Sequence, residues 1–571
     1  MHGPNDAVAR LRGVLDAIDD DILALVERRI AAARAIGAAK PGGAPLKLRP
    51  AREAAVVARL EAAASPAARP AVRPVWRELM AQCVQAQAPM ALVLGADDPA
   101  LRLLAREAFG SAPAVAVAAS PADALARAEA GGAVAILPLP LPRLPPALVA
   151  FRTLGDGAAA VGRLAAEAPT RRRDWFPGSW RARPAVQMPL YPDAAALAEV
   201  EAALAAAEPV VAIAEAAALR AALARAAEGE AMLVQAGDCA ESFAAFSPAR
   251  VAEERALLLA LGDCLPGEVV HVARAAGQFA KPRSAALEAG GDGLLPSYRG
   301  DAVNGAAACR GARVADPRRL LRAHAQSRAT VRLLEGLDAA ARIEAPTPPV
   351  YVSHEALLLP YEQALTRRDG DGRWWATSAH MVWIGARTRD ADGAHVDYAS
   401  GIANAVGVKC DPMLTPDALS RLLDRLDPAN EAGRVTLIGR FGAGEVGRAL
   451  PPLLRRTRAE GRRVLWACDP MHGNTRVLGG IKTRLVADIL AELRDFVVIA
   501  GAEGVHAGGI HLEATAAPVT ECVGGADGVA PADLSTRYES LCDPRLNRAQ
   551  ALEAAAWTAL CLGGGSEARA A

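Results

Sequence analysis

The larger, C-terminal part of the chain carries a repeating pattern of short strands separated by helical stretches. Its apolar, β-rich runs are AMLVQ (231–235), VVHVA (269–273), VYV (350–352), HMVWI (380–384), ANAVGV (403–408), VTLI (435–438), RVLWA (463–467) and GIHL (509–512). Strands that alternate with helices form parallel sheets, and eight such units can close into a (β/α)8 barrel. The pattern therefore predicts a TIM barrel, an α/β fold whose active site gathers at the C-terminal strand ends.

A reactive or charged side chain follows each predicted strand. These residues are Cys239, Arg274, His354, Arg387, Lys409, Arg440, Asp469 with His472, and Glu513. One charge after a strand is commonly a solvated loop residue. Reactive or charged side chains after all eight strands of one barrel indicate a single polar site.

The side chains near these strand ends form two chemical sets. A cationic set, suited to phosphate or carboxylate groups of a substrate, comprises Arg274, Lys281, Arg283, Arg387, Lys409 and Arg440. A metal-ligand set comprises Cys239, His472, Glu513 and, as a fourth candidate, Asp543. Mixed sulfur, nitrogen and oxygen ligands suit Mn²⁺, Co²⁺, Fe²⁺ or Zn²⁺. These candidates are far apart in sequence, so only the barrel would bring them together.

Composition narrows the class of protein. Among 571 residues, 64 Lys and Arg balance 64 Asp and Glu, and this zero net charge argues against nucleic-acid binding. Hydrophobic residues make up 52%, which excludes a disordered chain, and no apolar run reaches the ~18–20 residues of a membrane helix. The start lacks a signal-sequence pattern, and nine cysteines without a CxxC pair are typical of a reducing compartment. We expect a cytoplasmic protein of about two to four domains.

The first ninety residues predict a small all-helical domain. Apolar residues alternate at spacings of four and three, the buried seam of one long helix, at Leu11, Leu15, Ile18, Ile22 and Leu25. Arg29 follows on this seam, where a guanidinium is costly unless it meets an anion; a salt-bridged or snorkelling arginine is the alternative. Further helical stretches begin near residue 52 and span 75–87. A pocket for a small dicarboxylate would be formed by Arg12, Arg29, Lys40 and Arg52.

The string RLRGVLDAIDDDILALVERRIAAARAIGAAK, with the later RE pair, resembles the all-helical chorismate mutases over residues 5–90. The resemblance implies that the two carboxylates of chorismate are held by Arg12, Arg29, Lys40 and Arg52. Glu53 would bind the substrate hydroxyl, and Gln87 would hydrogen-bond the ether oxygen that breaks. The rearrangement to prephenate is pericyclic, so catalysis would come from holding a compact conformer and stabilising negative charge.

Two positions depart from this family's pattern. Cys83 replaces a small polar residue, and Arg49 stands where an acidic residue can occur. The helical domain is therefore either a mutase or a sensor of chorismate or prephenate. Such domains usually work as interlocked dimers, so we expect a homo-oligomer, a dimer or a tetramer.

Residues 91–170 predict a small α/β spacer. ALVLGADD followed by PALRLLAREAFG predicts strand, turn and helix, and AVAILPLPLP predicts another strand. The layout faintly resembles half of a prephenate dehydratase without its threonine-containing catalytic motif, so we expect no chemistry from it. The predicted domains are therefore 1–90, 91–170 and 171–571.

The remainder resembles the type II 3-deoxy-D-arabino-heptulosonate 7-phosphate (DAHP) synthases from about Trp175 to Leu562. The motifs, in order, are QMPLYPD, QAGDCAESF, AGQFAKPRS, LPSYRGDAVNG, SHEALLLPYEQALTR, WIGARTR, DGAHVDY, CDPMHGNT, KTR, GGIHLEAT, VTECVGG and YESLCDPRLN. That family joins phosphoenolpyruvate to erythrose 4-phosphate in the first step of the shikimate pathway. The resemblance implies a divalent metal, Mn²⁺ first and Co²⁺ as the alternative, which polarises the aldehyde carbonyl as a Lewis acid.

The same resemblance assigns site residues. The metal would be held by Cys239, His472, Glu513 and Asp543. Phosphoenolpyruvate would be held by Arg274, Arg387, Lys409 and Arg440. Candidates for the other substrate are Lys281, Arg283 and Lys482, of which Lys281 also counts among the catalytic residues.

Three departures from this second pattern are visible. Ala386 stands where the family reads glutamate, Cys410-Asp411-Pro412 replaces VGP, and the stretch between Asn474 and Lys482 is about one residue short. They leave open a variant that uses a related aldehyde, such as an imino sugar phosphate, in secondary metabolism.

Three hypotheses follow for the whole chain. It is a synthase fused to an active mutase, a synthase whose helical domain is an allosteric sensor, or a catalytically inactive barrel that serves as a scaffold.

Overall fold

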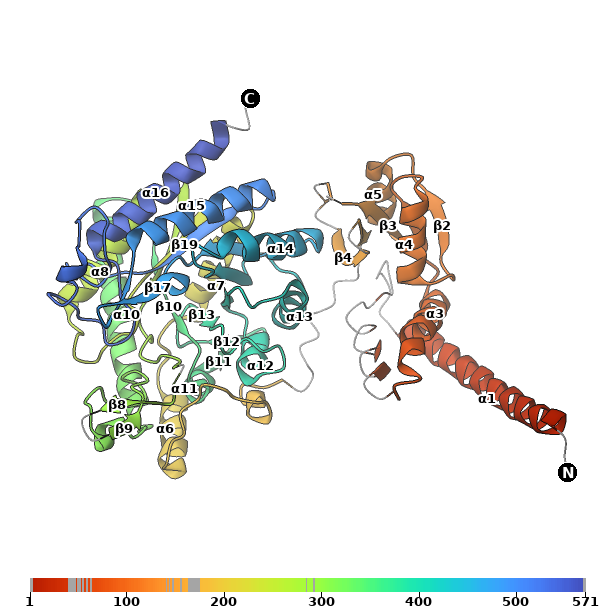
Figure 1. Cartoon of the computed structure of the whole chain (residues 1–571), viewed down its shortest axis with the longest axis horizontal. Helices are drawn as coiled ribbons and strands as arrows, with labels where there is room; N and C mark the ends of the chain where they lie inside the picture. The colour runs from red at the N-terminus through yellow and green to blue at the C-terminus, as the bar shows by residue number, and fades with distance from the viewer. Residues whose placement is uncertain are drawn as a thin grey trace. The chain divides into compact units, whose positions relative to one another are not determined.

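The computed structural model describes residues 4–39, 48, 53, 56–57, 60–61, 64–139, 141–142, 144–145, 148–154, 157–162, 175–283, 285–290 and 293–567. The chain divides into two compact units, residues 1–169 with 458–462 and residues 170–457 with 463–571 (Figure 1). The first unit holds both the N-terminal helices and the sheet that follows them, so the predicted boundary at residue 90 stays a prediction.

Eight parallel strands of the second unit close into a barrel, in the order β10-β13-β14-β15-β16-β19-β6-β7. They are β6 (Ala231–Gly237), β7 (Glu268–Arg274), β10 (Val350–Glu355), β13 (Met381–Ile384), β14 (Ala405–Cys410), β15 (Val435–Gly439), β16 (Leu465–Cys468) and β19 (Ala507–Glu513). Every predicted run is a barrel strand, which confirms the predicted TIM barrel. The runs were recognisable because strands covered on both faces are almost continuously apolar.

Helices surround this barrel (Figure 1). They are α6 (Ala194–Ala206), α7 (Ile213–Ala227), α8 (Pro248–Asp263), α9 (Arg310–Arg313), α10 (Arg319–Glu344), α11 (Leu359–Ala364), α12 (Ala394–Gly401), α13 (Pro416–Leu426), α14 (Val446–Ala459), α15 (Val486–Ala502) and α16 (Arg548–Glu567). Three hairpins, which the sequence reading did not predict, pair β8 (Leu287–Gly290) with β9 (Gly293–Pro296), β11 (Thr366–Arg368) with β12 (Trp374–Ala376), and β17 (Thr475–Leu478) with β18 (Ile481–Arg484).

The barrel interior is layered. Near the amino ends of the strands, Leu219 and Leu223 of α7 belong to one apolar cluster with Leu233, Met381 and Leu465. Side chains alternate along a strand, so the residues two and four places further on face the same side. By that rule, the middle layer of the barrel contains both polar and apolar side chains, and the layer at the carboxyl ends of the strands contains charged side chains.

The first unit contains two described helices before its sheet, α1 (Pro4–Ala39) and α3 (Arg69–Gln87). The sheet has the order β2-β1-β3-β5-β4, with β1 (Ala91–Leu94), β2 (Ala114–Val117), β3 (Ala133–Pro138), β4 (Val149–Leu154) and β5 (Ala158–Gly162). Asp98 caps α4 (Pro99–Phe109), and Ser120 caps α5 (Pro121–Ala130). The long helix, the third helical stretch and the strands at 91–94 and 133–138 were predicted correctly.

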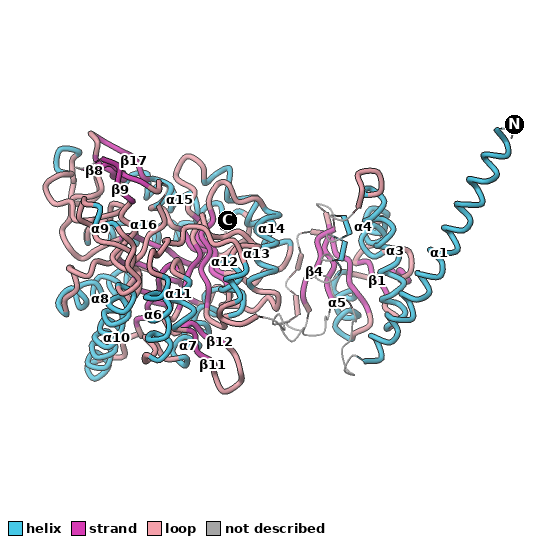
Figure 2. The backbone as a smooth tube through the Cα atoms, turned by 90° about the horizontal axis from the view of Figure 1, so that it is seen from below, coloured by secondary structure: helices cyan, strands magenta, loops and turns pink. Residues whose placement is uncertain are grey.

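The apolar seam of α1 is exposed. Leu11, Leu15, Ile18, Ile22 and Leu25 show 46–65% of their surface. The prediction that this seam is buried is wrong for the single chain, because α1 runs on past α3 (Figure 2). None of the described helices combines the length and the apolar character that crossing a membrane requires.

Candidate active site

The charged layer of the barrel is organised around the carboxylate of Glu513, which ends β19 and is fully buried. Its Oε1 accepts hydrogen bonds from Arg274 Nη2 at 2.9 Å and Lys281 Nζ at 3.0 Å. Arg484 lies 2.8 Å from Oε2. Burial by itself would raise the pKa of Glu513, but His472, Lys281 and Arg484 hold it well below the ordinary value.

The predicted metal ligands meet beside this carboxylate. One ligand atom each from Cys239, Glu513 and Asp543 lie within 4.8 Å of one another. His472 joins them through Nε2, 3.1 Å from Glu513 Oε1. Its Nδ1 lies 2.7 Å from the carboxylate of Asp469. A metal-binding imidazole commonly bonds to a carboxylate in this way through its other ring nitrogen. A cysteine sulfur, an imidazole and two carboxylates fit a divalent ion.

Contacts with other loops hold Asp543, the candidate metal ligand nearest the C-terminus, in place. The backbone N–H of Asp543 donates to Cys239 Sγ at 3.2 Å. The neighbouring Arg545 bridges Glu521 at 2.7 Å and Asp238 at 2.6 Å. These partners escaped the sequence reading because each lies outside a strand and looks like an ordinary loop charge.

Three of the predicted cations, Arg274, Lys409 and Arg440, contact this cluster or its neighbours. The indole of Trp383 supports two of them, with Arg274 5.1 Å and Lys409 5.9 Å from its ring centroid. Lys409 donates to Asp469 at 2.5 Å, and burial lowers the pKa of Lys409 to about 8. Arg440 is partly buried, and one of its Nη2–H groups bonds to the carbonyl of His472 at 3.3 Å.

The remaining predicted cations occupy more peripheral places. Lys482, on β18, pairs with Asp543 at 3.0 Å and so reaches the rim of the cluster. Arg283 pairs with Glu288 of β8 at 3.1 Å. Arg387 is exposed on the loop after β13, so its role stays a prediction.

One strand-end assignment is corrected. His354 faces away from the barrel interior and bonds to Glu362 of α11 at 2.8 Å. The next residue, Glu355, points inward instead, because successive side chains of a strand alternate. Glu355 Oε1 is buried without a hydrogen-bond partner among the described residues, and a Cβ on Gly385 would lie 2.2 Å from it. Burial raises the pKa of Glu355, against the lowering effect of Lys281 and Lys409.

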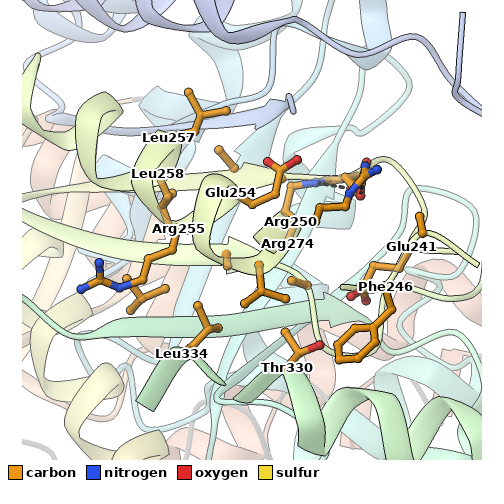
Figure 3. A pocket seen from close by; sticks show the side chains of 18 of the residues that line it. Glu241, Phe246, Arg250, Glu254, Arg255, Leu257, Leu258, Arg274, Thr330 and Leu334 are labelled. Atoms are coloured by element: carbon orange, nitrogen blue, oxygen red, sulfur yellow. Dashed lines mark hydrogen bonds and ion pairs between the residues drawn. The ribbon is translucent and has the colours of Figure 1, made fainter. Parts of the chain in front are cut away.

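A separate cavity of about 80 Å³ lies between the β6 and β7 strands and helices α8 and α10 (Figure 3). It is lined mainly by apolar side chains, among them Leu257, Leu258 and Leu334. Glu254 is one of the carboxyl groups that line it, partial burial raises its pKa to about 7, and its Oε1 accepts from Thr515 at 2.6 Å. The cavity adjoins Arg274 from outside the barrel.

The helical domain shows only part of its predicted pocket. Arg29 donates to Cys83 Sγ at 2.7 Å and to the carbonyl of Leu79 at 3.3 Å, which joins α1 to α3. Gln87 donates to the carbonyl of Cys83 at 3.2 Å, and Glu53 pairs with Arg152 of β4 at 2.7 Å.

Two of the four predicted cations, Arg12 and Arg29, lie far apart within one chain. Arg12 is exposed and, at about 1.5 Å of rise per residue, lies about 26 Å from Arg29 along α1. One small dicarboxylate cannot contact both residues of the same chain, and a pocket that contains all four cations stays a prediction. Lys40 and Arg52, and likewise Arg49, lie outside the described residues.

Comparison with known proteins extends this description. The Class-II DAHP synthetase family matches residues 175–346 and 336–559, and Chorismate mutase type II matches residues 11–88. A phospho-2-dehydro-3-deoxyheptonate aldolase of Streptomyces coelicolor is 41% identical over 430 residues, which are 66% of this chain and 95% of that protein. The corresponding aldolase AroG of Mycolicibacterium smegmatis is 41% identical over 430 residues, 66% of this chain and 92% of that protein.

A solved structure, the phospho-2-dehydro-3-deoxyheptonate aldolase from Francisella tularensis, covers 64% of this chain and 96% of its own, with 16% identity and a TM-score of 0.39. The extent of the family match and the identity to the two bacterial aldolases establish the family to which the barrel belongs. The chain belongs to the class-II DAHP synthetase family, as a DAHP synthase of the first shikimate step that carries an N-terminal type II chorismate mutase domain.

Proposed function

We propose that the charged layer at the carboxyl ends of the strands is where the barrel joins phosphoenolpyruvate to erythrose 4-phosphate. The observation that carries this proposal is the meeting of Arg274, Lys409 and Arg440 with the ligand-type residues around Glu513. Two phosphates and a carboxylate repel one another, and fixed cations in a site shielded from water offset that repulsion.

Class-II DAHP synthases are metal-dependent. We propose that Cys239, His472, Glu513 and Asp543 hold the ion, Mn²⁺ or Co²⁺, which when bound supplies Lewis-acid polarisation of the aldehyde carbonyl. In the reaction C3 of phosphoenolpyruvate bonds to the aldehyde carbon, water adds at C2, and the C2–oxygen bond to phosphate breaks.

The side chains have separate parts in this scheme. Arg274 and Lys409, both resting on Trp383, would hold the anionic groups of phosphoenolpyruvate. Arg440 would extend this cationic wall, together with Arg387. Lys281, Arg283 and Lys482 remain the candidates for the second phosphate, and Lys281 already touches two of the ligand carboxylates.

Cys239→Ala is expected to lower the affinity for Mn²⁺ by at least about tenfold, because the soft ligand is lost. Isothermal titration of the EDTA-treated protein with Mn²⁺ measures this directly, and synthase turnover should fall in parallel. Cys264→Ala is the matched control, since that thiol lies at the end of α8 and, among the described residues, bonds only to the carbonyl of Ala260. Equal Mn²⁺ affinity in both variants would contradict the ligand assignment.

The proton on Lys409 should govern the alkaline side of the pH profile. Burial lowers its pKa to about 8, so the ammonium that would bind an anion is lost as the pH rises through that value. We expect kcat/KM for phosphoenolpyruvate to fall about tenfold per pH unit above this point. Lys409→Arg keeps its charge at every accessible pH and should move the fall upward. An unchanged midpoint in that variant would show that another group titrates.

We propose that the helical domain rearranges chorismate to prephenate. Arg29 and Gln87 both bond to Cys83, so the cation for a carboxylate and the amide for the ether oxygen lie on two sides of one residue. The catalysis would then consist of holding the folded conformer and stabilising charge on the breaking ether oxygen.

Arg29→Ala is expected to lower kcat/KM for chorismate by about 10–100-fold, the effect of losing a hydrogen bond from a charged donor. Prephenate formation measures it, and the DAHP synthase rate of the same protein should not change. Arg28→Ala, an exposed neighbour on the same helix, is the matched control. Equal mutase rates for the two variants would remove Arg29 from the site.

A regulatory role for the helical domain is the second candidate. The ion pair between Glu53 and Arg152 favours it, because this contact ties a residue of the expected pocket to the α/β sheet. A wild-type protein that converts no chorismate, yet changes its synthase rate when chorismate or prephenate is added, would establish this second function in place of the first.

We propose a homodimer formed through α1. The exposed apolar seam of that helix supports it, and so does the separation of Arg12 from Arg29, since a second copy could supply the missing cation. A cytoplasmic location is proposed as well, on the ground that all nine cysteines are free thiols.

The double substitution Leu15→Glu and Ile22→Glu should convert the oligomer into a smaller species, because it places charges on the apolar seam. Sedimentation equilibrium reports the mass, and mutase activity should fall with it. Leu103→Glu on α4 is the control, an equally exposed leucine away from this seam. An unchanged mass in the double variant would exclude α1 as the interface.

A further inference from the structure

We infer that a hydrogen-bonded chain of Ser353, Gln235 and His511 inside the barrel orients the guanidinium of Arg274 for its anionic substrate. The three are positioning residues, since each acts on the substrate only through Arg274. The inference rests on the proposed role of Arg274 in binding phosphoenolpyruvate.

These side chains form the polar part of the middle layer of the barrel. Gln235, Ser353 and His511 are all fully buried. Buried polar groups cost free energy unless their hydrogen bonds are made, and apolar side chains are the usual filling of this layer. Because they lie one layer below Arg274 and Glu513, we expect these polar side chains to act on the charged layer above them.

The direction of every hydrogen bond in this chain follows from the groups at the two ends of the chain, the carbonyl of Ala273 and the guanidinium of Arg274. The carbonyl of Ala273 is purely an acceptor, so Ser353 Oγ donates its proton there, at 2.9 Å. Ser353 must then accept from Gln235 Nε2, at 2.8 Å. That contact fixes the amide of Gln235, whose Oε1 is left facing His511 Nδ1 at 2.7 Å.

His511 therefore carries its proton on Nδ1 and presents a lone pair on Nε2. That nitrogen contacts Arg274 Nη1, which can only donate. The chain thus starts at the backbone of Ala273, crosses β10, β6 and β19, and returns to the side chain of the next residue on β7. It couples the orientation of the guanidinium to the backbone of its own strand.

The guanidinium is held at all three of its nitrogens. Besides the contact with His511, Nε donates to the carbonyl of Asp238 at 3.2 Å and Nη2 donates to Glu513 at 2.9 Å. Three of five N–H groups are used in this way. The other two, one on each terminal nitrogen, have no acceptor among the described residues and are available to an anion in a fixed orientation.

Two substitutions at His511 separate positioning from packing. The amide oxygen of His511→Gln can accept from Arg274, whereas His511→Leu fills similar space and cannot accept. We expect KM for phosphoenolpyruvate to rise about tenfold or more in the leucine variant and clearly less in the glutamine variant, with a smaller change in kcat. KM for erythrose 4-phosphate and the Mn²⁺ affinity should stay within about twofold, the scatter of a near-neutral substitution.

Gln235→Met tests the chain without touching Arg274. It removes the acceptor for His511 Nδ1, so the proton can move to Nε2 and oppose the donor on Arg274. KM for phosphoenolpyruvate should rise as in His511→Leu. His395→Gln is the matched control, a buried imidazole with one bond to the carbonyl of Leu357, and should leave this KM unchanged.

Thermal midpoints of all variants separate folding from function. A fall in the midpoint of His511→Leu and Gln235→Met with no rise in KM for phosphoenolpyruvate would overturn the inference, since the chain would then only stabilise the barrel. A parallel loss of Mn²⁺ affinity would overturn it too, because the effect would run through Glu513. An unchanged KM in Arg274→Ala would instead remove the proposed anion role of Arg274, and this inference with it.

Discussion

The charge on Glu513 is the constraint on which the second unit depends. A carboxylate taken out of water is tolerated only when opposite charges and hydrogen bonds replace its hydration. Arg274, Lys281 and Arg484 do this from three different elements. Because the same carboxylate also faces His472, the cations proposed to bind the substrate and the ligand-type residues form one electrostatic system and not two neighbouring sites.

This sharing has a functional meaning. Lys281 pairs with Glu513 and Asp543, and Arg274 pairs with Glu513. Under the proposed ligand assignment, a divalent ion bound to those oxygens would take over part of the negative charge that these cations neutralise. Their attraction for a phosphate or carboxylate should then increase, so that ion and anionic substrate strengthen each other's binding.

Much of the barrel could be predicted from the sequence, because buried parallel strands consist of short apolar runs between helices. It was harder to predict which face of a strand each polar side chain occupies. His354 and Glu355 are adjacent and both polar, and only the parity of the strand decides that Glu355 faces the site. Strands β2 and β5 escaped because alanine-rich segments carry little β signal, and β4 was missed although its sequence, VAFRTL, is not alanine-rich.

The helical domain shows a second kind of limit. Residue types predicted a cationic pocket, but a straight helix keeps Arg12 and Arg29 apart whatever their chemistry. Periodicity likewise identified the apolar seam of α1 without revealing what covers it. Contacts between chains leave the same mark on a sequence as contacts within one chain.

The ion pair between Glu53 and Arg152 changes how the small sheet should be regarded. The sheet is expected to contribute no chemistry of its own, yet it supplies the counter-charge for a residue of the preceding helices. Arg152 is also anchored at the carbonyl of Ala108 and over the ring of Phe109. A fragment ending at the predicted boundary, residue 90, would therefore lack Arg152, the ion-pair partner of Glu53.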